Sequence, residues 1–254
     1  IKQVPNTNEV KLDPVTGTLI RDGVPSIMNP DDKAGLEAAL RLKDSMGAHV
    51  TVVSMGPMQA DAVLREAMAM GADDAYLISD RAFGGADTLA TSTTIAAAIK
   101  KIPYDLIITG RQAIDGDTAQ VGPQIAEHLN IPNVSYAEDI QVEGDTVTVK
   151  RQYEDRYHTV KVKMPCLITA LSELNQPRYM TPGGIFDAYR EKTVTVWTVN
   201  DIEVDMDKIG LKGSPTRVFQ SFPKSLKAAG TVVTLDGEEA ADYMLEKLRE
   251  KFII

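Results

Sequence analysis

The sequence predicts an α/β fold, a parallel sheet with helices on both faces, followed by antiparallel strands and a C-terminal arm. Two observations support this prediction. Between residues 29 and 130, short apolar runs alternate with segments of helical spacing, which is typical of parallel strands joined by crossover helices. Between residues 134 and 171, strand-like runs follow one another across short turns, which indicates antiparallel pairing.

Composition sets the class of protein. The chain has 254 residues, with 43% hydrophobic and 25% charged residues, as in an ordinary globular protein. No apolar run is long enough to predict a membrane span, and a formal charge of −9 argues against nucleic acid as a partner. The single cysteine, Cys166, excludes an internal disulfide and favours a reducing compartment, so we expect a cytoplasmic protein with this residue buried in a strand.

The first elements are a strand end, a hairpin and a helix. Residues 1–5 have the pattern of the end of a strand, and residues 10–20 alternate around a Pro- and Gly-containing turn, which predicts a β-hairpin. A helix is predicted over residues 29–47. Its boundary signals are Asn29 as N-cap, Pro30 at the first helical position, Asp31 and Asp32 in the first turn, and Gly47 at the end.

The alternation then continues in order. Strands are predicted over residues 48–56, 74–79 and 104–109, and helices over residues 57–72, 87–102 and 118–130. The second half contains strands between 134 and 171, with turns at 143–145 and 154–156, then a strand over 193–199 and a closing helix over 238–252. Residues 200–229 show little periodicity, which favours an arm that packs on another chain. We therefore divide the chain into an α/β domain, 1–199, and a C-terminal arm and helix, 200–254.

The stretch GRQAIDGDTAQVGP, residues 110–123, joins a predicted strand to a predicted helix. Its glycines, Gly110, Gly116 and Gly122, allow a ligand to approach the backbone closely. Residues 118–120 are predicted to begin the helix, where free N–H groups and the helix dipole bind phosphate. Because the loop lies at the carboxyl end of a parallel strand, we expect a phosphate-bearing ligand there, a nucleotide in particular.

The alternative is a solvated connection with Asp117 as helix cap. The loop matches neither a P-loop nor a GxGxxG fingerprint, so by itself it leaves both interpretations open. Two other segments, residues 29–32 and 54–57, are predicted at the same sheet edge, and three loops there would form a cleft, which favours a nucleotide. We expect Asp115 and Asp117 to meet ribose hydroxyls or backbone donors, because carboxylates repel phosphate.

Other chemistry finds little support. The three histidines, His49, His128 and His158, are far apart and show no metal-ligand spacing, so we predict no metal site. No residue stands out as a general acid, general base or nucleophile, so no catalytic residue is assigned.

Seven segments together carry a family resemblance. The stretches IKQVP, MNPDDKAGLEAALRLK, VSMGP, AMAMGAD, GRQAIDGDTAQVGP, KMPCLITA and LNQPRYMTPGGI span nearly the whole chain. In this order they closely resemble the β (small) subunit of electron transfer flavoproteins. The resemblance implies a Rossmann-like, adenine-nucleotide-binding domain that forms a heterodimer with an α subunit carrying a redox-active FAD.

The resemblance also implies the ligand and its contacts. The β subunit binds AMP in simple shuttling members of the family and a second FAD in electron-bifurcating members. The positions of this sequence that match the family's site are Asn29, Pro30, Asp31, Asp32, Met55, Gly110, Arg111, Gln112, Ala113, Ile114, Asp115, Gly116, Asp117, Thr118, Ala119, Gln120 and Val121.

The letters DGDT, residues 115–118, resemble bifurcating members, because shuttling members carry bulkier and more acidic residues after QAID. We therefore expect FAD in this subunit, NADH as hydride donor, and an acyl-CoA dehydrogenase and ferredoxin or flavodoxin as electron acceptors. Two alternatives stay open: an AMP-binding subunit of a simple electron shuttle, and a nucleotide-sensing module without a redox role. A count of flavins per heterodimer distinguishes the simple shuttle from a bifurcating complex. Purification as a stable monomer or homodimer without an α partner would favour the nucleotide-sensing module.

Shuttling members dock dehydrogenases through the loop after NQPRY. Here that loop reads MTPGGIF, residues 180–186, where Pro182, Gly183 and Gly184 replace a more apolar anchor. From its proline and glycines alone, this loop is predicted to be a turn.

Overall fold

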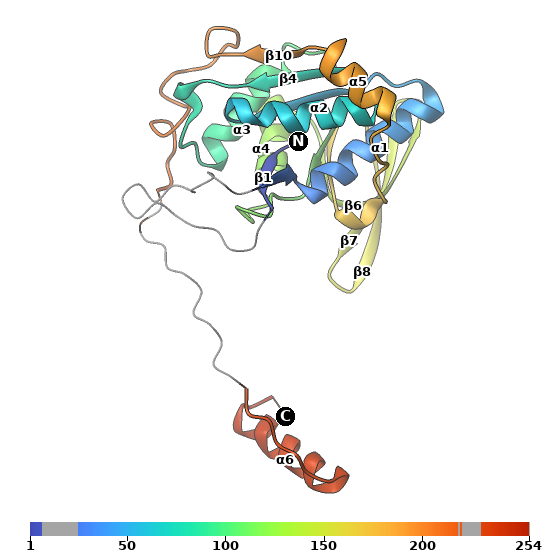
Figure 1. Cartoon of the computed structure of the whole chain (residues 1–254), viewed down its shortest axis with the longest axis vertical. Helices are drawn as coiled ribbons and strands as arrows, with labels where there is room; N and C mark the ends of the chain where they lie inside the picture. The colour runs from blue at the N-terminus through green and yellow to red at the C-terminus, as the bar shows by residue number, and fades with distance from the viewer. Residues whose placement is uncertain (7–24, 218, 220–229, 254) are drawn as a thin grey trace. The chain divides into compact units, whose positions relative to one another are not determined.

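The computed structural model describes residues 1–6, 25–217, 219 and 230–253 (Figure 1). Two compact units make up the chain, Ile1–Phe219 and Gln220–Ile254. The hairpin predicted over residues 10–20 lies outside the described residues. Within the described part of the chain, no helix is both long and apolar enough to cross a membrane.

The first half of unit 1 confirms the predicted alternation of strands and helices. Its elements are β1 (Gln3–Pro5), β2 (Ser26–Met28), α1 (Pro30–Met46), β3 (Thr51–Met55), α2 (Asp61–Met70), β4 (Asp74–Ile78), α3 (Thr88–Ile99), β5 (Leu106–Gly110) and α4 (Val121–Leu129). Short 3-10 turns, Met58–Ala60 and Arg81–Phe83, precede α2 and α3. Asp87 caps α3 as predicted, because its carboxylate accepts a hydrogen bond from the Ala90 N–H at 3.0 Å.

The second half contains the strands predicted between residues 134 and 171. Its elements are β6 (Asn133–Glu143), β7 (Thr146–Tyr153), β8 (Arg156–Lys163), β9 (Cys166–Ala170), a 3-10 turn (Ser172–Leu174), α5 (Pro182–Arg190), β10 (Val194–Trp197) and, in the second unit, α6 (Gly237–Glu250).

The strands form parallel sheets with an antiparallel extension. One sheet has the order β10-β4-β3 and is parallel throughout. The other has the order β5-β9-β6-β7-β8, in which β9 is parallel to both β5 and β6, and β6, β7 and β8 are antiparallel. The antiparallel addition is therefore shorter than the sequence indicated, because β9 returns to the parallel sheet beside β5.

Helices cover both faces of the parallel strands. Leu77 packs with side chains of α1 and α2, whereas its neighbour Ile78 packs with Phe83 and α3 on the opposite side. Such alternation follows from strand geometry, in which successive side chains point to opposite faces. Leu167 of β9 joins a further cluster with side chains of α3 and α4. The core is thus layered, as the sequence predicted.

A cavity of about 1900 Å³ lies between the two larger sheets. Residues of β3 line one side of it and residues of β5 line the other, and no ladder joins these two strands in the described part of the chain. Ile1 N donates a hydrogen bond to the Val53 carbonyl at 2.9 Å, so this residue lies beside β3. Residues at the carboxyl ends of β3 and β5, among them Met55 and Gly110, also line the cavity.

The residues that follow β10 up to Phe219 belong to unit 1, and some of them pack in its core. Ile202 and Ile209 are buried in the cluster that contains Phe83, and Thr216 donates a hydrogen bond from its hydroxyl to Asp87 at 2.7 Å. In contrast, α6 has no buried residue among its described side chains. The packing of a C-terminal arm on a second subunit stays a prediction.

Residues 180–186, predicted to form a turn, instead begin α5. Thr181 accepts a hydrogen bond from the Gly184 N–H at 3.0 Å as the N-cap, and Pro182 occupies the first helical position. A Cβ on Gly184 would lie 2.3 Å from the Ala69 carbonyl oxygen, so this glycine lets α5 approach the end of α2. The turn prediction was wrong because the proline and glycines serve the start of a helix and a close contact.

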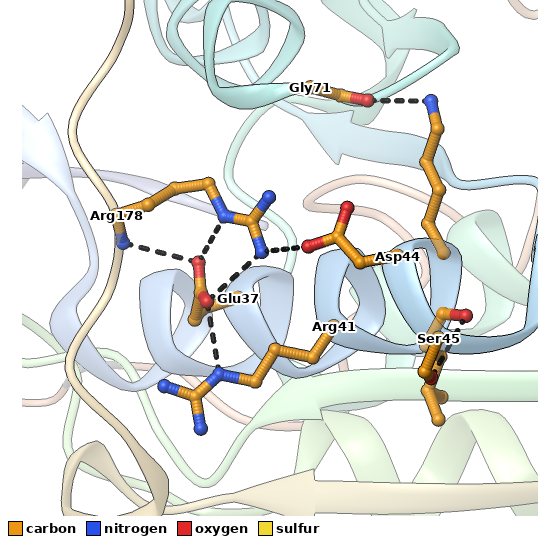
Figure 2. A network of polar contacts seen from close by, with 8 residues as sticks. Glu37, Arg41, Asp44, Ser45, Gly71 and Arg178 are labelled. Atoms are coloured by element: carbon orange, nitrogen blue, oxygen red, sulfur yellow. Dashed lines mark hydrogen bonds and ion pairs between the residues drawn. The ribbon is translucent and has the colours of Figure 1, made fainter.

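A network of charged groups fixes the segment before α5 to α1 (Figure 2). Glu37, only 4% exposed, accepts hydrogen bonds from the Arg178 side chain at 2.8 Å and from Arg41 at 3.0 Å. Arg178 also donates to Asp44 at 2.7 Å. Burial acts to raise the pKa of Glu37, but the bonds from Arg178 and Arg41 hold it below its usual value. The carboxylate therefore stays ionised although it is buried.

Candidate functional site

The loop of residues 110–121 begins at the carboxyl end of β5, as predicted. Gly110 lies in register with Ala170 at the end of β9, and the Arg111 N–H donates to the Ala170 carbonyl at 2.8 Å. Met55, at the carboxyl end of β3, lines the same cavity. The structure thus gathers the predicted residues at one edge of the parallel strands.

Asn29 does not cap α1 with its side chain. Its carboxamide instead donates to the Gln112 carbonyl at 2.8 Å and accepts from the Ile114 N–H at 3.1 Å. The expected capping bond is therefore wrong, because the buried side chain bonds with backbone groups of the loop more than 80 residues further along the chain.

Asp32 joins the loop to the segment entering β1. Its carboxylate accepts hydrogen bonds from the Gly110 N–H at 2.8 Å and from the Lys2 N–H at 2.7 Å. Both oxygens are therefore committed to the protein backbone. Charge-assisted bonds of this kind are stronger than neutral ones, so they fix where the loop leaves β5.

Asp31 is buried and holds two further segments. It accepts a hydrogen bond from the Ser172 N–H at 3.0 Å, and Arg111 Nε lies 3.4 Å from its other oxygen, an ion pair without hydrogen-bond geometry. Burial raises the pKa of Asp31, and the positive charge of Arg111 opposes this rise. Together Asn29, Asp31 and Asp32 tie the amino end of α1 to its surroundings.

The two aspartates of the loop also have protein partners. Asp115, with a side chain only 5% exposed, forms an ion pair with Lys2 at 2.7 Å. Asp117 accepts a hydrogen bond from the Gln112 side chain. The expectation that these carboxylates meet ribose hydroxyls stays a prediction, and their partners here are a lysine and a side-chain amide.

The start of α4 differs from the prediction. Asp117 and Ala119 both have φ of 53°, in the left-handed region, and the helix begins at Val121 rather than at residues 118–120. Gln120 occupies the N-cap position, so Asp117 is not the cap that the alternative interpretation required. Helix prediction failed here because left-handed backbone is uncommon for residues other than glycine.

The three glycines of the loop have different environments. A Cβ on Gly110 would lie 2.4 Å from an Asp32 carboxylate oxygen, and one on Gly122 would lie 2.6 Å from the Thr109 hydroxyl. Nothing lies within 4 Å of the position that a Cβ on Gly116 would take. Gly110 and Gly122 are thus required by packing, whereas Gly116 leaves open space beside the loop.

The amino end of α4 suits an anion better than that of α1. Helix α1 has Asp31 and Asp32 in its first turn, whereas α4 has no acidic residue in its first turn and no side-chain cap. Unpartnered N–H groups and the positive end of the helix dipole remain available at such a terminus. A phosphate group therefore fits α4 and is disfavoured at α1.

The sequence prediction missed the segment before α3. Residues 84–88 and Thr91 line the same cavity as the loop, and the Thr88 hydroxyl donates to the Gln120 side-chain oxygen at 2.9 Å. The starts of α3 and α4 therefore face the cavity side by side. A signal was present in GGADT, where two glycines follow a strand and precede a capping aspartate and a threonine.

Among the described residues, no group of three or more His, Cys, Asp or Glu side chains is arranged to hold a metal ion. Cys166 is fully buried in β9, and burial raises the pKa of its thiol. A buried thiol with a raised pKa is a poor nucleophile, in agreement with its predicted role as a small core residue.

Comparison with known proteins adds independent information. A family model described as "Electron transfer flavoprotein domain" matches residues 16–202. An electron transfer flavoprotein subunit beta of Clostridium acetobutylicum is 60% identical over 100% of this chain and 98% of its own length. The caffeyl-CoA reductase-Etf complex subunit CarD of Acetobacterium woodii is 57% identical over 100% of this chain and 97% of its own. The acryloyl-CoA reductase electron transfer subunit gamma of Anaerotignum propionicum is 48% identical over 100% and 98%.

These similarities cover the parallel strands, the loop and the amino end of α1 in a single alignment. They agree with a helix-covered parallel sheet whose loops meet at one edge. The chain belongs to the electron transfer flavoprotein family, as a β subunit that functions in electron transfer with an α subunit as its partner.

Proposed function

We propose that this chain binds FAD within an NADH-oxidising, electron-bifurcating complex, with an acyl-CoA dehydrogenase and ferredoxin or flavodoxin as acceptors. The observation that carries this proposal is the open space beside Gly116, where a Cβ would meet no atom within 4 Å. Names of relatives that refer to caffeyl-CoA and acryloyl-CoA reductases support an acyl-CoA enzyme as partner.

The residues present fit a dinucleotide. The start of α4 has unpartnered N–H groups for a phosphate, and the start of α3 lies beside it, with Thr88 and Gly85 lining the same cavity. The first half of the loop is fixed by Asn29 and Asp32, so it offers a rigid backbone surface. FAD, when bound, supplies hydride acceptance and one-electron transfer. The chain's own groups bind it, orient it and exclude water.

The partner subunit is proposed to cover α6. This helix has exposed Met244, Leu245 and Leu248, and no buried residue among those described. An amphipathic helix without apolar contacts of its own is expected to bury that face against another chain. We therefore propose that the C-terminal arm, residues 200–254, docks on the α subunit through the apolar face of α6, and we expect the chain expressed alone to aggregate.

The proposal is tested by a cofactor count. The purified heterodimer is denatured, and the FAD and AMP released are measured per heterodimer. Two FAD and no AMP are expected, whereas one FAD and one AMP would show a simple electron shuttle. Anaerobic mixing with NADH then separates the mechanisms, because two flavins that are not reduced on a catalytic timescale contradict bifurcation.

A further inference from the structure

The side chain of Asn29 is fully buried but forms no bond to the helix that follows it. Its backbone is used locally: its N–H donates to the Lys2 carbonyl at 2.9 Å, and its carbonyl accepts from the Lys33 N–H at 2.9 Å. A buried carboxamide without partners would be costly, so the partners it does have determine its role.

Those partners are a carbonyl and an N–H of the loop. Nδ2 of Asn29 donates to the Gln112 carbonyl, and its Oδ1 accepts from the Ile114 N–H. A carboxamide supplies both a donor and an acceptor, as a peptide group does. Aspartate has the same shape but lacks the donor, and leucine lacks both. The contact therefore specifies asparagine rather than any side chain of that size.

The two bonds lie on either side of Ala113, whose carbonyl closes the turn that follows. This carbonyl accepts hydrogen bonds from the Gly116 N–H at 3.2 Å and from the Asp117 N–H at 2.8 Å. Fixing Gln112 and Ile114 therefore fixes the direction in which residues 116–120 leave the sheet edge. Residues 116–120 lead directly into the first turn of α4.

We infer that Asn29 is a positioning residue for the loop of residues 110–121, where the nucleotide is proposed to bind. It acts through the backbone of Gln112 and Ile114 and not through contact with the ligand. The inference rests on the proposed function, and it assigns to Asn29 a different role from the direct contact that the family resemblance implies. Its side chain has no exposed surface with which to touch a bound nucleotide.

The test compares two asparagines in the nucleotide-free heterodimer. Asn29→Asp removes the donor to Gln112. Asn175→Asp is the matched control, since Asn175 also donates to a backbone carbonyl, that of Ala34, at 2.9 Å, but away from the loop. Arg111 is the only tryptic site between Lys101 and Lys150, so cleavage after it reports the order of the loop.

Asn29→Asp is expected to speed cleavage after Arg111 at least tenfold and to weaken binding of FAD, or of AMP, at least tenfold. Asn175→Asp is expected to leave the cleavage rate within twofold of the wild type. Binding is measured by titrating each nucleotide into the same preparations.

A second pair of variants tests the contact from the loop, in case Asn29→Asp fails to fold. Ile114→Pro removes the N–H that Asn29 accepts, at the second position of a turn, where proline is favoured. Ile114→Ala removes the same side chain, which is 49% exposed, and keeps the N–H. The proline variant is expected to be cleaved at least fivefold faster than the alanine variant and to bind at least fivefold more weakly.

Three results would overturn the inference. Faster cleavage with unchanged nucleotide affinity would mean that the loop's order does not matter for binding. Weaker binding with unchanged cleavage would mean that Asn29 contacts the ligand directly. A wild-type heterodimer that binds neither nucleotide would refute both the proposed function and a role of Asn29 in nucleotide binding. In that case the two asparagine variants would still differ in cleavage rate, which would show that Asn29 orders the loop without serving a nucleotide.

Discussion

The two halves of the loop after β5 are built differently. Residues 110–115, the anchored half, are held by the side chains of Asn29, just before α1, of Asp32 in its first turn, and of Lys2. Residues 116–120, the open half, are mostly exposed, contain two left-handed residues and leave free space at Gly116. Small residues in the anchored half are therefore dictated by packing, whereas those in the open half leave room for a ligand. The same amino acid, glycine, has opposite roles only a few residues apart.

The largest expected effect is on stability, in the anchored half. Gly110→Ala would place a Cβ 2.4 Å from Asp32 and break the bond that its own N–H makes. We expect a loss of about 3 kcal/mol in the free energy of unfolding, measured by urea denaturation of the heterodimer. Gly116→Ala is the control and should change that free energy by less than about 0.5 kcal/mol. Equal effects at both sites would erase the distinction between the halves.

The next effect is on binding, in the open half. Gly116→Glu would bring a carboxylate beside the proposed phosphate site and weaken FAD binding about a hundredfold, equivalent to about 2.7 kcal/mol. FAD content of the purified heterodimer measures this loss. Gly116→Gln adds the same bulk without charge and separates repulsion from steric exclusion. Full FAD content in the glutamate variant would show that Gly116 does not lie at the FAD site.

A smaller, pH-dependent effect is expected at Arg111. Because the folded-state pKa of Asp31 is raised by burial, this carboxyl favours folding below pH 3.8, and its contribution is lost as the pH rises through the folded-state value. The positive charge of Arg111 limits the loss of stability that comes from ionising Asp31. Arg111→Met should therefore lower the free energy of unfolding by about 1 kcal/mol at pH 7 and by clearly less near pH 4. Melting temperatures at both pH values check this, and a cost that grows towards low pH would contradict it.

The smallest effect is expected at Ala119, where φ is 53°. Ala119→Gly relieves left-handed strain but adds flexibility to the unfolded chain, for a net gain of about 0.5 kcal/mol. A rise in melting temperature of about 1–2 °C is the expected result. Glycine would then be favoured over alanine at one position in each half, by close packing at residue 110 and by backbone conformation at residue 119. A lower melting temperature for this variant would argue against strain in the open half.

Local signals predicted elements well and distant contacts poorly. The bounds of α1 follow from Pro30 and Gly47, whose effects act within one turn of the helix. The role of Asn29 did not follow, because its partners lie more than 80 residues away and the sequence offered capping as a nearer use. The start of α5 was predictable from Thr181 and Pro182, but the two glycines after them outweighed that signal.

The candidate site was predictable in outline only. Three loops at one strand edge could be expected from the alternation of strands and helices, and the loop of residues 110–121 does lie there. The difference between Gly110 and Gly116 could not be expected, because it depends on the position of Asp32 across the fold. The segment before α3 was missed for a related reason. The alternation of strands and helices predicts which loops lie at one edge of the sheet, but it does not predict that the starts of α3 and α4 are neighbours.

The buried cysteine of β9 allows local opening of the core to be measured by thiol modification. Cys166 is the only cysteine, it is fully buried, and its strand lies between β5 and β6. A thiol reagent can reach the sulfur only when the core cluster that covers it opens, so the rate of its modification reports such openings rather than collisions with the surface. Under native conditions, that rate measures how often the sheet that supports the loop opens. No label has to be introduced into the protein.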